Sequence, residues 1–221
     1  MTKKPNIKIG RPKKTKDEIQ TSKQQILTAT RSIFGANGTQ GTTVAKIVDA
    51  AAISRPTFYK YFSNSEQAID LVIEQAHQRL IIRLMHIMPT VANSQDDNIS
   101  RILTILDSYL EWSKEEKEIL ESIHQELLVS GSPVAKHRSL TLDAMHKLLK
   151  RYFKKSGKNI PDRYIFETAA IGMEDIAYLI TLKSSPSTAK LYRKQMLKLV
   201  IALFGDMEDW REAGANNFLF S

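Results

Sequence analysis

The chain has 221 residues, of which 42% are hydrophobic and 25% charged, and its formal net charge is +8. This composition is typical of a soluble globular protein, and no apolar run approaches the ~18 residues that a membrane-spanning helix needs. The absence of cysteine excludes disulfides and thiolate metal sites. The basic N-terminus has no apolar stretch behind it and is not a secretory signal, so we expect a cytoplasmic protein with no membrane partner.

The positive charge is concentrated at the N-terminal end. Residues 1–65 contain 12 Lys/Arg against Asp17, Glu18 and Asp49, a balance of +9, so the remaining 156 residues sum to −1. Such an asymmetry is typical of a protein with one part that meets polyanions and another part that does not. A basic tail that only confers solubility is the alternative.

Helical periodicity extends over nearly the whole chain, and valine and threonine are too scattered for a sheet, so we predict an all-α protein of about nine helices. Capping-box spacings begin three of them, at Thr21, Ser63 and Ser113, and Gly or Pro residues mark most of the ends. Residues 89–98 are predicted to be a loop, and no structure is assigned to residues 207–221. The predicted helices are 21–36, 43–51, 54–62, 63–88, 99–112, 113–130, 132–155, 164–182 and 185–204.

The segment SRPTFYKYF (residues 54–62) contains four aromatic rings. At ~100° per residue, three of the rings fall on one helical face, which must pack against the domain because so short a helix is not stable alone. The opposite side offers a phenol, an ammonium and a hydroxyl that can hydrogen-bond to phosphates and base edges. The inner set is Phe58, Tyr61 and Phe62, and the outer set is Tyr59 and Lys60, with Thr57 at the border.

The preceding segment completes a helix-turn-helix, in which the second of two short helices enters the DNA major groove. The run GTTVAKIVDAAAISRPTFYKYFSNSEQAIDLV, preceded by ILTATRSIFGANG, resembles the N-terminal domain of TetR-family transcriptional regulators over residues 22–75. The sequence departs from the family pattern at Ala52, where the family usually has glycine in the turn. The resemblance implies that the following residues contact DNA: Thr43, Lys46, Arg55, Thr57, Tyr59 and Lys60.

The family resemblance also implies a division of the chain into a DNA-binding domain and a helical body for ligand binding and dimerisation. We expect a basic disordered arm (1–20), the helix-turn-helix domain (21–65), the body (66–206) and a C-terminal tail (207–221). Within the arm, GRPKK has the Gly-Arg-Pro core of minor-groove hooks, so Arg11, Lys13 and Lys14 are candidates for further DNA contacts. A solvated tail is the alternative for this weak motif.

Aromatic and methionine residues of the body are candidates to line a pocket for an unidentified small-molecule effector. The candidates are Tyr109, Trp112, His124, Met145, Met173 and Tyr178, each of which could instead be ordinary core. His124 and Glu121 share a helix, but no partner motif completes a metal site, so we expect neither metal nor cofactor.

The last two predicted helices of the body are rich in apolar and small residues. The resemblance implies that they pair with their copies in a homodimer, which predicts a palindromic operator. The candidate interface residues are Ala169, Gly172, Ile176, Met196, Leu199, Val200 and Leu203.

These features predict a ligand-responsive DNA-binding regulator, of which a repressor is the commonest kind in the family. Two other classes stay open: a helical-bundle enzyme with a basic arm, and a DNA-binding module that responds to no ligand. The sequence has no phosphate-binding glycine loop, His-Glu-x-x-His pair or nucleophile elbow, so no catalytic residue is nominated.

Overall fold

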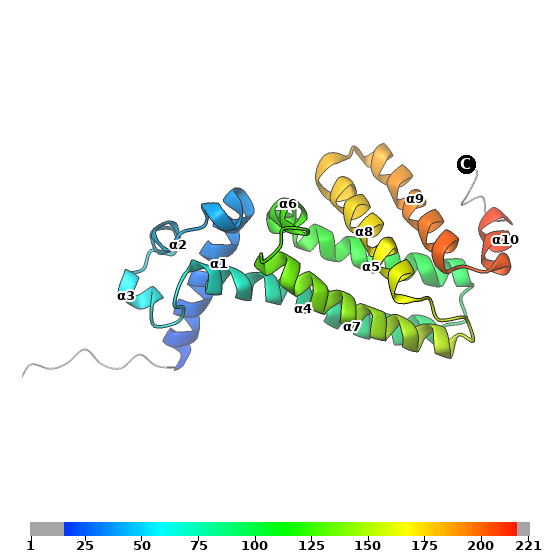
Figure 1. Ribbon diagram of the computed structural model, residues 1–221, viewed down its shortest axis with the longest axis horizontal. Helices are drawn as coiled ribbons and strands as arrows, with labels where there is room; N and C mark the ends of the chain where they lie inside the picture. The colour runs from blue at the N-terminus through cyan, green and yellow to red at the C-terminus, as the bar shows by residue number, and fades with distance from the viewer. Residues whose placement is uncertain (1–15, 216–221) are drawn as a thin grey trace, which may run out of the picture.

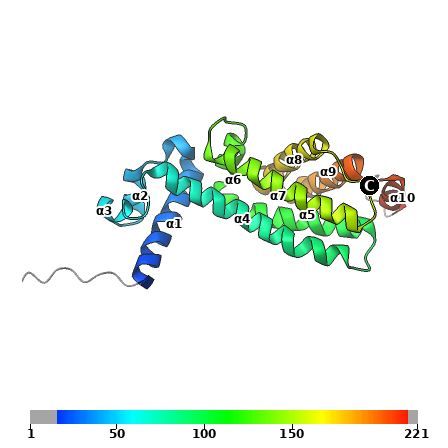
Figure 2. The ribbon, with the colours of Figure 1, turned by 60° about the horizontal axis from the view of Figure 1, so that its bottom comes forward.

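The computed structural model describes residues 16–215. Over this range the chain forms ten α-helices and one π-helical turn without any strand, which confirms the all-α prediction. Figure 1 shows an elongated molecule with a small head at one end and a helical body at the other, and the view in Figure 2 agrees. Within residues 16–215, none of the helices combines the length and hydrophobicity that crossing a bilayer requires.

Three helices form the head, and the long fourth helix leads from it into the body (Figure 1). The head helices are α1 (Lys16–Gly41), α2 (Val44–Ala50) and α3 (Arg55–Phe58). The body helices are α4 (Ser65–Ala92), α5 (Asn98–Glu115), α6 (Lys117–Glu126), α7 (Pro133–Lys155), α8 (Arg163–Tyr178), η1 (Leu179–Lys183), α9 (Pro186–Phe204) and α10 (Met207–Ala215).

One core joins the head to the near end of the body. Phe34, Phe58 and Ile69 are completely buried, and Ile119 of α6 belongs to the same cluster. Burial of large apolar side chains is the main stabilising term in such a domain, about 25 cal/mol per Å² of apolar surface. The head is therefore held against the body by side-chain packing as well as by the covalent connection into α4.

Several predicted caps are confirmed by their hydrogen bonds. The side chains of Ser54, Ser132 and Ser185 each accept a hydrogen bond from a backbone N–H of the first turn that follows, and proline stands in that turn in all three cases. A missing proline N–H costs nothing there, because the first-turn donors have no intrahelical partner.

All three predicted capping boxes are wrong, and two of them lie in the N-terminal part of the chain. Helix α1 begins at Lys16 rather than at Thr21, so residues 16–20, which were assigned to the arm, are helical. Helix α4 is capped by Asn64 rather than Ser63, since Asn64 Oδ1 accepts from Gln67 N at 2.9 Å. For α4, a cap one residue away satisfies the same donors, and spacing alone does not distinguish Ser63 from Asn64.

The third predicted capping box fails because Ser113 lies inside α5. Its hydroxyl is buried and donates to the Leu110 carbonyl oxygen at 2.8 Å. The predicted stop at Pro89 also fails, since α4 continues to Ala92. Met88 and Val91 are buried, and their packing outweighs the one hydrogen bond that proline removes near the end of the helix.

Residues 207–215 of the predicted tail form α10, which packs against α5. Asp206 Oδ1 accepts hydrogen bonds at 3.0 Å from the backbone N–H groups of Glu208 and Asp209, which caps the helix. Ala213 is completely buried, and Glu212 accepts from the Ile99 backbone N–H at 3.3 Å. This segment therefore belongs to the body.

Candidate nucleic-acid interface and ligand cavity

The turn between α2 and α3 contains a strained residue. Ala52 has φ 50°, the left-handed region that favours glycine. Two backbone hydrogen bonds hold this turn: Ala52 N donates to Asp49 O at 3.2 Å, and Ile53 N donates to Val48 O at 3.0 Å. The departure from the family's glycine thus falls at the one described non-glycine residue with positive φ.

Helix α3 and the turn that follows it direct their aromatic side chains two ways, as predicted, although the helix ends at Phe58 rather than at Phe62. Phe58 and Phe62 are 0% and 4% exposed, and Tyr61 is half-buried against the same cluster. Tyr59 is 54% exposed, and its ring meets Phe58 edge to face with centroids 5.5 Å apart. The buried rings of Phe58 and Phe62 pack the four-residue helix against the head. Tyr59, the residue that follows the helix, therefore projects outward from a fixed backbone.

The other candidate DNA-contact residues near Tyr59 differ in whether their side chains are exposed or already held by a neighbouring residue. Arg55 and Lys60 are exposed. Thr57 Oγ1 lies 2.9 Å from Ser54 Oγ within the cap of α3. Arg11, Lys13 and Lys14 fall outside the described residues.

The candidates on α2 are tied to the local fold. Thr43 caps this helix, with its hydroxyl oxygen 3.4 Å from Lys46 N. The Lys46 ammonium donates to the Gly41 carbonyl oxygen at 2.8 Å and to Asn37 Oδ1 at 3.3 Å. Lys46 is exposed although its ammonium group makes these two contacts.

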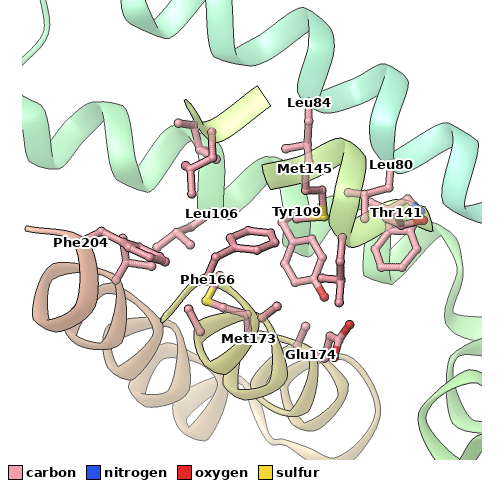
Figure 3. Close-up of a pocket in the computed structure, with 18 of the residues that line it drawn as sticks. Leu80, Leu84, Leu106, Tyr109, Thr141, Met145, Phe166, Met173, Glu174 and Phe204 are labelled. Atoms are coloured by element: carbon pink, nitrogen blue, oxygen red, sulfur yellow. The ribbon is translucent and has the colours of Figure 1, made fainter. Parts of the chain in front are cut away.

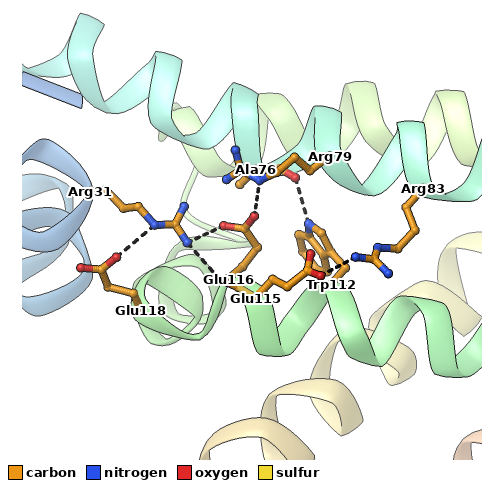
Figure 4. A network of polar contacts seen from close by, with 8 residues as sticks. All are labelled: Arg31, Ala76, Arg79, Arg83, Trp112, Glu115, Glu116 and Glu118. Carbon is orange, nitrogen blue, oxygen red and sulfur yellow. Dashed lines mark hydrogen bonds and ion pairs between the residues drawn. The ribbon is translucent and has the colours of Figure 1, made fainter. Parts of the chain in front are cut away.

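A buried carboxylate connects the head to two body helices (Figure 4). Glu116, between α5 and α6, is 1% exposed and lies 2.7 Å from Arg31 of α1 and 2.6 Å from Arg79 of α4. Burial by itself raises the pKa of Glu116, but the two guanidinium groups outweigh it and hold that pKa below its usual value. The carboxylate is therefore ionised at neutral pH.

Helices α1 and α6 touch at the level of the backbone. A Cβ on Gly35 would lie 2.1 Å from the Glu118 carbonyl oxygen. Ser122 Oγ donates to the Phe34 carbonyl oxygen at 2.8 Å, and Glu126 accepts from Thr39 N at 2.8 Å and from Thr39 Oγ1 at 2.6 Å. Any displacement of α6 must therefore move α1 or break these contacts.

The body encloses a cavity of about 200 Å³ whose walls come from all the helices from α4 to α10. Figure 3 shows that its lining is mainly leucine, methionine and aromatic side chains. All six candidates from the sequence line it: Tyr109, Trp112, His124, Met145, Met173 and Tyr178.

His124 is neither deeply buried nor isolated. Its side chain is 29% exposed and stacks on Tyr178, with ring centroids 3.9 Å apart and an interplanar angle of 7°. His124 Nε2 lies 3.2 Å from Asp175 Oδ1. Trp112 is held differently, since its Nε1–H donates to the Ala76 carbonyl oxygen at 2.9 Å.

Sequence reasoning missed three polar residues of the cavity wall. Arg138 Nε donates to both carboxylate oxygens of Glu174, at 2.9 and 3.0 Å, and the terminal nitrogen lies 2.7 Å from Oε2. Burial raises the pKa of Glu174 although Arg138 opposes the shift. Burial also lowers the pKa of His77 to about 4, so this ring is neutral at pH 7. In the sequence, the only sign of each of these three residues was that it is a polar residue within an apolar helical stripe.

Three of the seven candidate dimer residues face inward instead. Met196 is completely buried and Ala169 is 2% exposed, so neither can contribute contact surface, and Val200 lines the cavity. A Cβ on Gly172 would lie 2.8 Å from Leu199 Cδ2, so this glycine allows α8 and α9 of one chain to approach each other. Helical periodicity identified buried faces without distinguishing a chain's own core from an interface. Ile176, Leu199 and Leu203 are half-buried.

Among the described residues, no group of three or more acidic, histidine or cysteine side chains could hold a metal ion. His77, His124, His137 and His146 lie on three different helices and are paired with aromatic rings or single carboxylates.

Comparison with known proteins identifies the head. A family model described as bacterial regulatory proteins of the tetR family matches residues 26–68, from α1 to the start of α4. The transcriptional regulator TtgR of Pseudomonas putida is 29% identical over 66 residues, which are 30% of this chain and 31% of that protein. The match therefore spans about a third of the length of this curated relative.

Solved structures are similar over the head and the body together. A TetR-family transcriptional regulator from Mesorhizobium loti has a TM-score of 0.65 at 14% identity, over 87% of this chain and 100% of that one. The fatty acid degradation regulator FadR from Bacillus halodurans has a TM-score of 0.63 at 17% identity, over 84% and 97%. At this level of identity the likeness concerns the fold.

Proposed function

Because the chain carries the tetR-type DNA-binding head and belongs to the TetR family of bacterial regulatory proteins, we propose that it is a homodimeric repressor that an effector releases from a palindromic operator. The family is one of transcriptional regulators and not of enzymes, which sets the enzyme alternative aside. The observation that carries the proposal is the two-sided segment formed by α3 and the turn after it, with Phe58 and Phe62 buried and Tyr59 exposed.

The exposed side of α3 would enter the major groove. Tyr59 and Lys60 would contact base edges and phosphates. Arg55 and Thr57, near the start of α3, would contact the phosphate backbone of the DNA. Backbone contacts would position the head, whereas Tyr59 would contribute to sequence preference. Residues 1–15 would add basic contacts to the same DNA.

The outer faces of α8 and α9 would form the dimer contact. Tyr164, Ile171 and Leu191 are 81%, 53% and 55% exposed, so these helices carry large apolar side chains on their free sides as well as on their buried ones. Exposed apolar patches of this kind mark contact surfaces. A two-fold dimer would place two α3 helices about 34–36 Å apart, one turn of DNA.

Helix α6 would couple the cavity to the head, because it borders both. Leu120 and His124 line the cavity, whereas Glu118, Ser122 and Glu126 contact α1. An effector that favours one position of α6 would thereby change the orientation of α1 and the heads, and DNA would reciprocally weaken effector binding.

Selection of bound DNA from a random pool tests the DNA-binding proposal. The expected result is a palindrome with half-sites about one helical turn apart. Light scattering of the purified chain should give the mass of a dimer at micromolar concentration. A stable monomer, or a pool without any enriched palindrome, would contradict the proposal.

A further inference from the structure

We infer that the effector is an uncharged amphiphile, with one hydrogen-bonding group such as a hydroxyl or ester carbonyl on an apolar chain or ring system. This identification rests on the proposed function, because it takes the cavity for the effector site. It follows from where the polar atoms of the cavity lie and from which of them already have partners.

One group of polar side chains gathers around one place in the cavity, and a second group, which includes Lys158 and Asp209, lines the wall beyond the C-terminal end of α7. The ring of Trp112 lies 6.4 Å from His77 and 5.6 Å from Tyr109, centroid to centroid. Arg138 is close enough to influence the pKa values of both His77 and Tyr109, and Glu174 that of Tyr109. Figure 3 shows the Tyr109 hydroxyl on the side of the cavity where Glu174 lies.

Two of these groups have unused hydrogen-bonding capacity. His77 is 7% exposed, and its Nδ1 is buried without a partner. Tyr109 is 9% exposed, and within residues 16–215 no group accepts a hydrogen bond from its hydroxyl. Burial raises the pKa of Tyr109, so the phenol is a neutral donor at pH 7. A hydroxyl or carbonyl of a ligand would satisfy donors and acceptors that otherwise carry a desolvation penalty.

The charged groups of the cavity, by contrast, are already paired. Arg138 is bound through two nitrogens by Glu174. Lys158 lies 3.2 Å from Asp206 Oδ2 and is also paired with the buried carboxylate of Asp209. A ligand carboxylate would either displace one of these carboxylates or add a second negative charge that has no counter-charge of its own, whereas a neutral molecule leaves both pairs intact.

The remainder of the cavity suits an apolar extension. His77 and Met88 of α4 both line it, and their separation of 11 positions along the helix corresponds to about 16 Å. Apart from these polar side chains and the Lys158–Asp209 pair, most of the wall is apolar, with Leu84, Phe166 and Phe204 among its residues (Figure 3). A dodecyl chain is therefore a suitable probe.

Isothermal titration calorimetry of the full chain with four dodecyl probes tests the inference. The probes are dodecan-1-ol, methyl dodecanoate, dodecanoate and dodecyltrimethylammonium, which share one apolar tail and differ in charge. We expect the alcohol and the ester to bind at least about tenfold more tightly than either ion. Dodecanoate affinity equal to or above that of the alcohol would overturn the inference, and so would the absence of binding by all four probes.

Two variants locate the polar group of the ligand. Tyr109→Phe keeps the ring and should weaken dodecan-1-ol binding about tenfold. Tyr192→Phe is the control, because Tyr192 of α9 is half-buried and is not among the residues that line the cavity, so it should change the affinity little. Equal effects of the two variants would contradict the assignment of Tyr109. Thermal unfolding of each variant shows whether the fold is intact.

A third variant should reverse the selectivity. Glu174→Gln is isosteric and deprives Arg138 of its counter-charge, so dodecanoate binding should become at least about tenfold tighter while alcohol binding changes little. No gain for dodecanoate would overturn the charge-pairing explanation.

DNA binding separates this inference from the proposed function. If dodecan-1-ol binds in the expected order but leaves the affinity for the selected palindrome unchanged, the ligand class is supported and the effector role is contradicted. If no palindrome is selected, the proposed repressor fails whatever the probes show.

Discussion

Arg31 of α1 lies 2.7 Å from the carboxylate of Glu116, which is 1% exposed where α5 passes into α6. Arg31→Met should lower the free energy of unfolding by about 1–3 kcal/mol, because a buried charge loses one of its two partners. Urea denaturation measures this loss. The matched control is Arg83→Met, whose partners Glu111 and Glu115 are 64% and 54% exposed. It should cost less than about 1 kcal/mol, and equal losses would contradict a special role for Glu116.

Gly35→Ala should separate α1 from α6. The added Cβ would lie 2.1 Å from the Glu118 carbonyl oxygen, and backbone cannot move aside as a side chain can. We expect a loss of about 1–3 kcal/mol in stability, measured by thermal or urea unfolding. Gly172→Ala is the control, since its Cβ would meet the end of a flexible leucine. A larger loss for Gly172→Ala would contradict the close contact at Gly35.

The two sides of the segment formed by α3 and the turn after it should respond differently to truncation. Tyr59→Ala should change the unfolding free energy by less than about 1 kcal/mol while abolishing binding to the selected palindrome, measured by fluorescence anisotropy. Phe62→Ala should cost roughly 3–5 kcal/mol, because its ring is 4% exposed in the core of the head. Normal operator binding by Tyr59→Ala would show that another face of the head reads DNA.

Ala52→Gly should stabilise the head by about 0.5–1 kcal/mol, since alanine at φ 50° carries a steric penalty that exceeds the extra chain entropy of glycine. Ala45→Gly, at an exposed site within α2, should act in the opposite direction by about 0.5–1 kcal/mol. Chemical denaturation of both variants gives the comparison. Destabilisation by both would mean that Ala52 is not strained.

Acid should destabilise the body through His77, whose pKa burial lowers from 6.5 to about 4, with His137 and Arg138 adding to the shift and Glu116 opposing it. The unfolded chain binds the proton first, so stability is full above pH 6.5 and falls as the pH drops toward 4, by about 3 kcal/mol. His77→Leu should flatten this dependence, and His86→Leu, at an exposed site, should not. If His77→Leu leaves the pH dependence of stability unchanged, groups other than His77 cause the acid sensitivity.

The features that could be predicted from the sequence are those set by near neighbours in the chain. The burial of Phe58 and the exposure of Tyr59 follow from helical geometry over a few residues, and the Ser54, Ser132 and Ser185 caps follow from hydrogen bonds within one turn. The Ala52 strain was visible only through comparison with the family pattern, because an alanine in a turn has no local signal of its own.

Apart from local capping choices such as Ser63 against Asn64, the features that failed depend on residues distant in the sequence. α4 continues past Pro89 because Met88 and Val91 are buried, and Met196 faces its own core because of how α9 lies on α8. The Arg138–Glu174 pair joins α7 to α8 across 36 residues, and Glu116 collects partners from α1 and α4.

The amino-acid sequence by itself thus determined the helical class, the helix-turn-helix and the direction of each ring in residues 58–62, because helical periodicity acts within a turn or two. Only the tertiary structure decided which charges of the cavity are paired, which apolar faces lie inside the chain, and how α6 comes to touch both the cavity and α1. Those relationships depend on the distances between helices, and the side chains that create them are no different in sequence from ordinary core or surface residues.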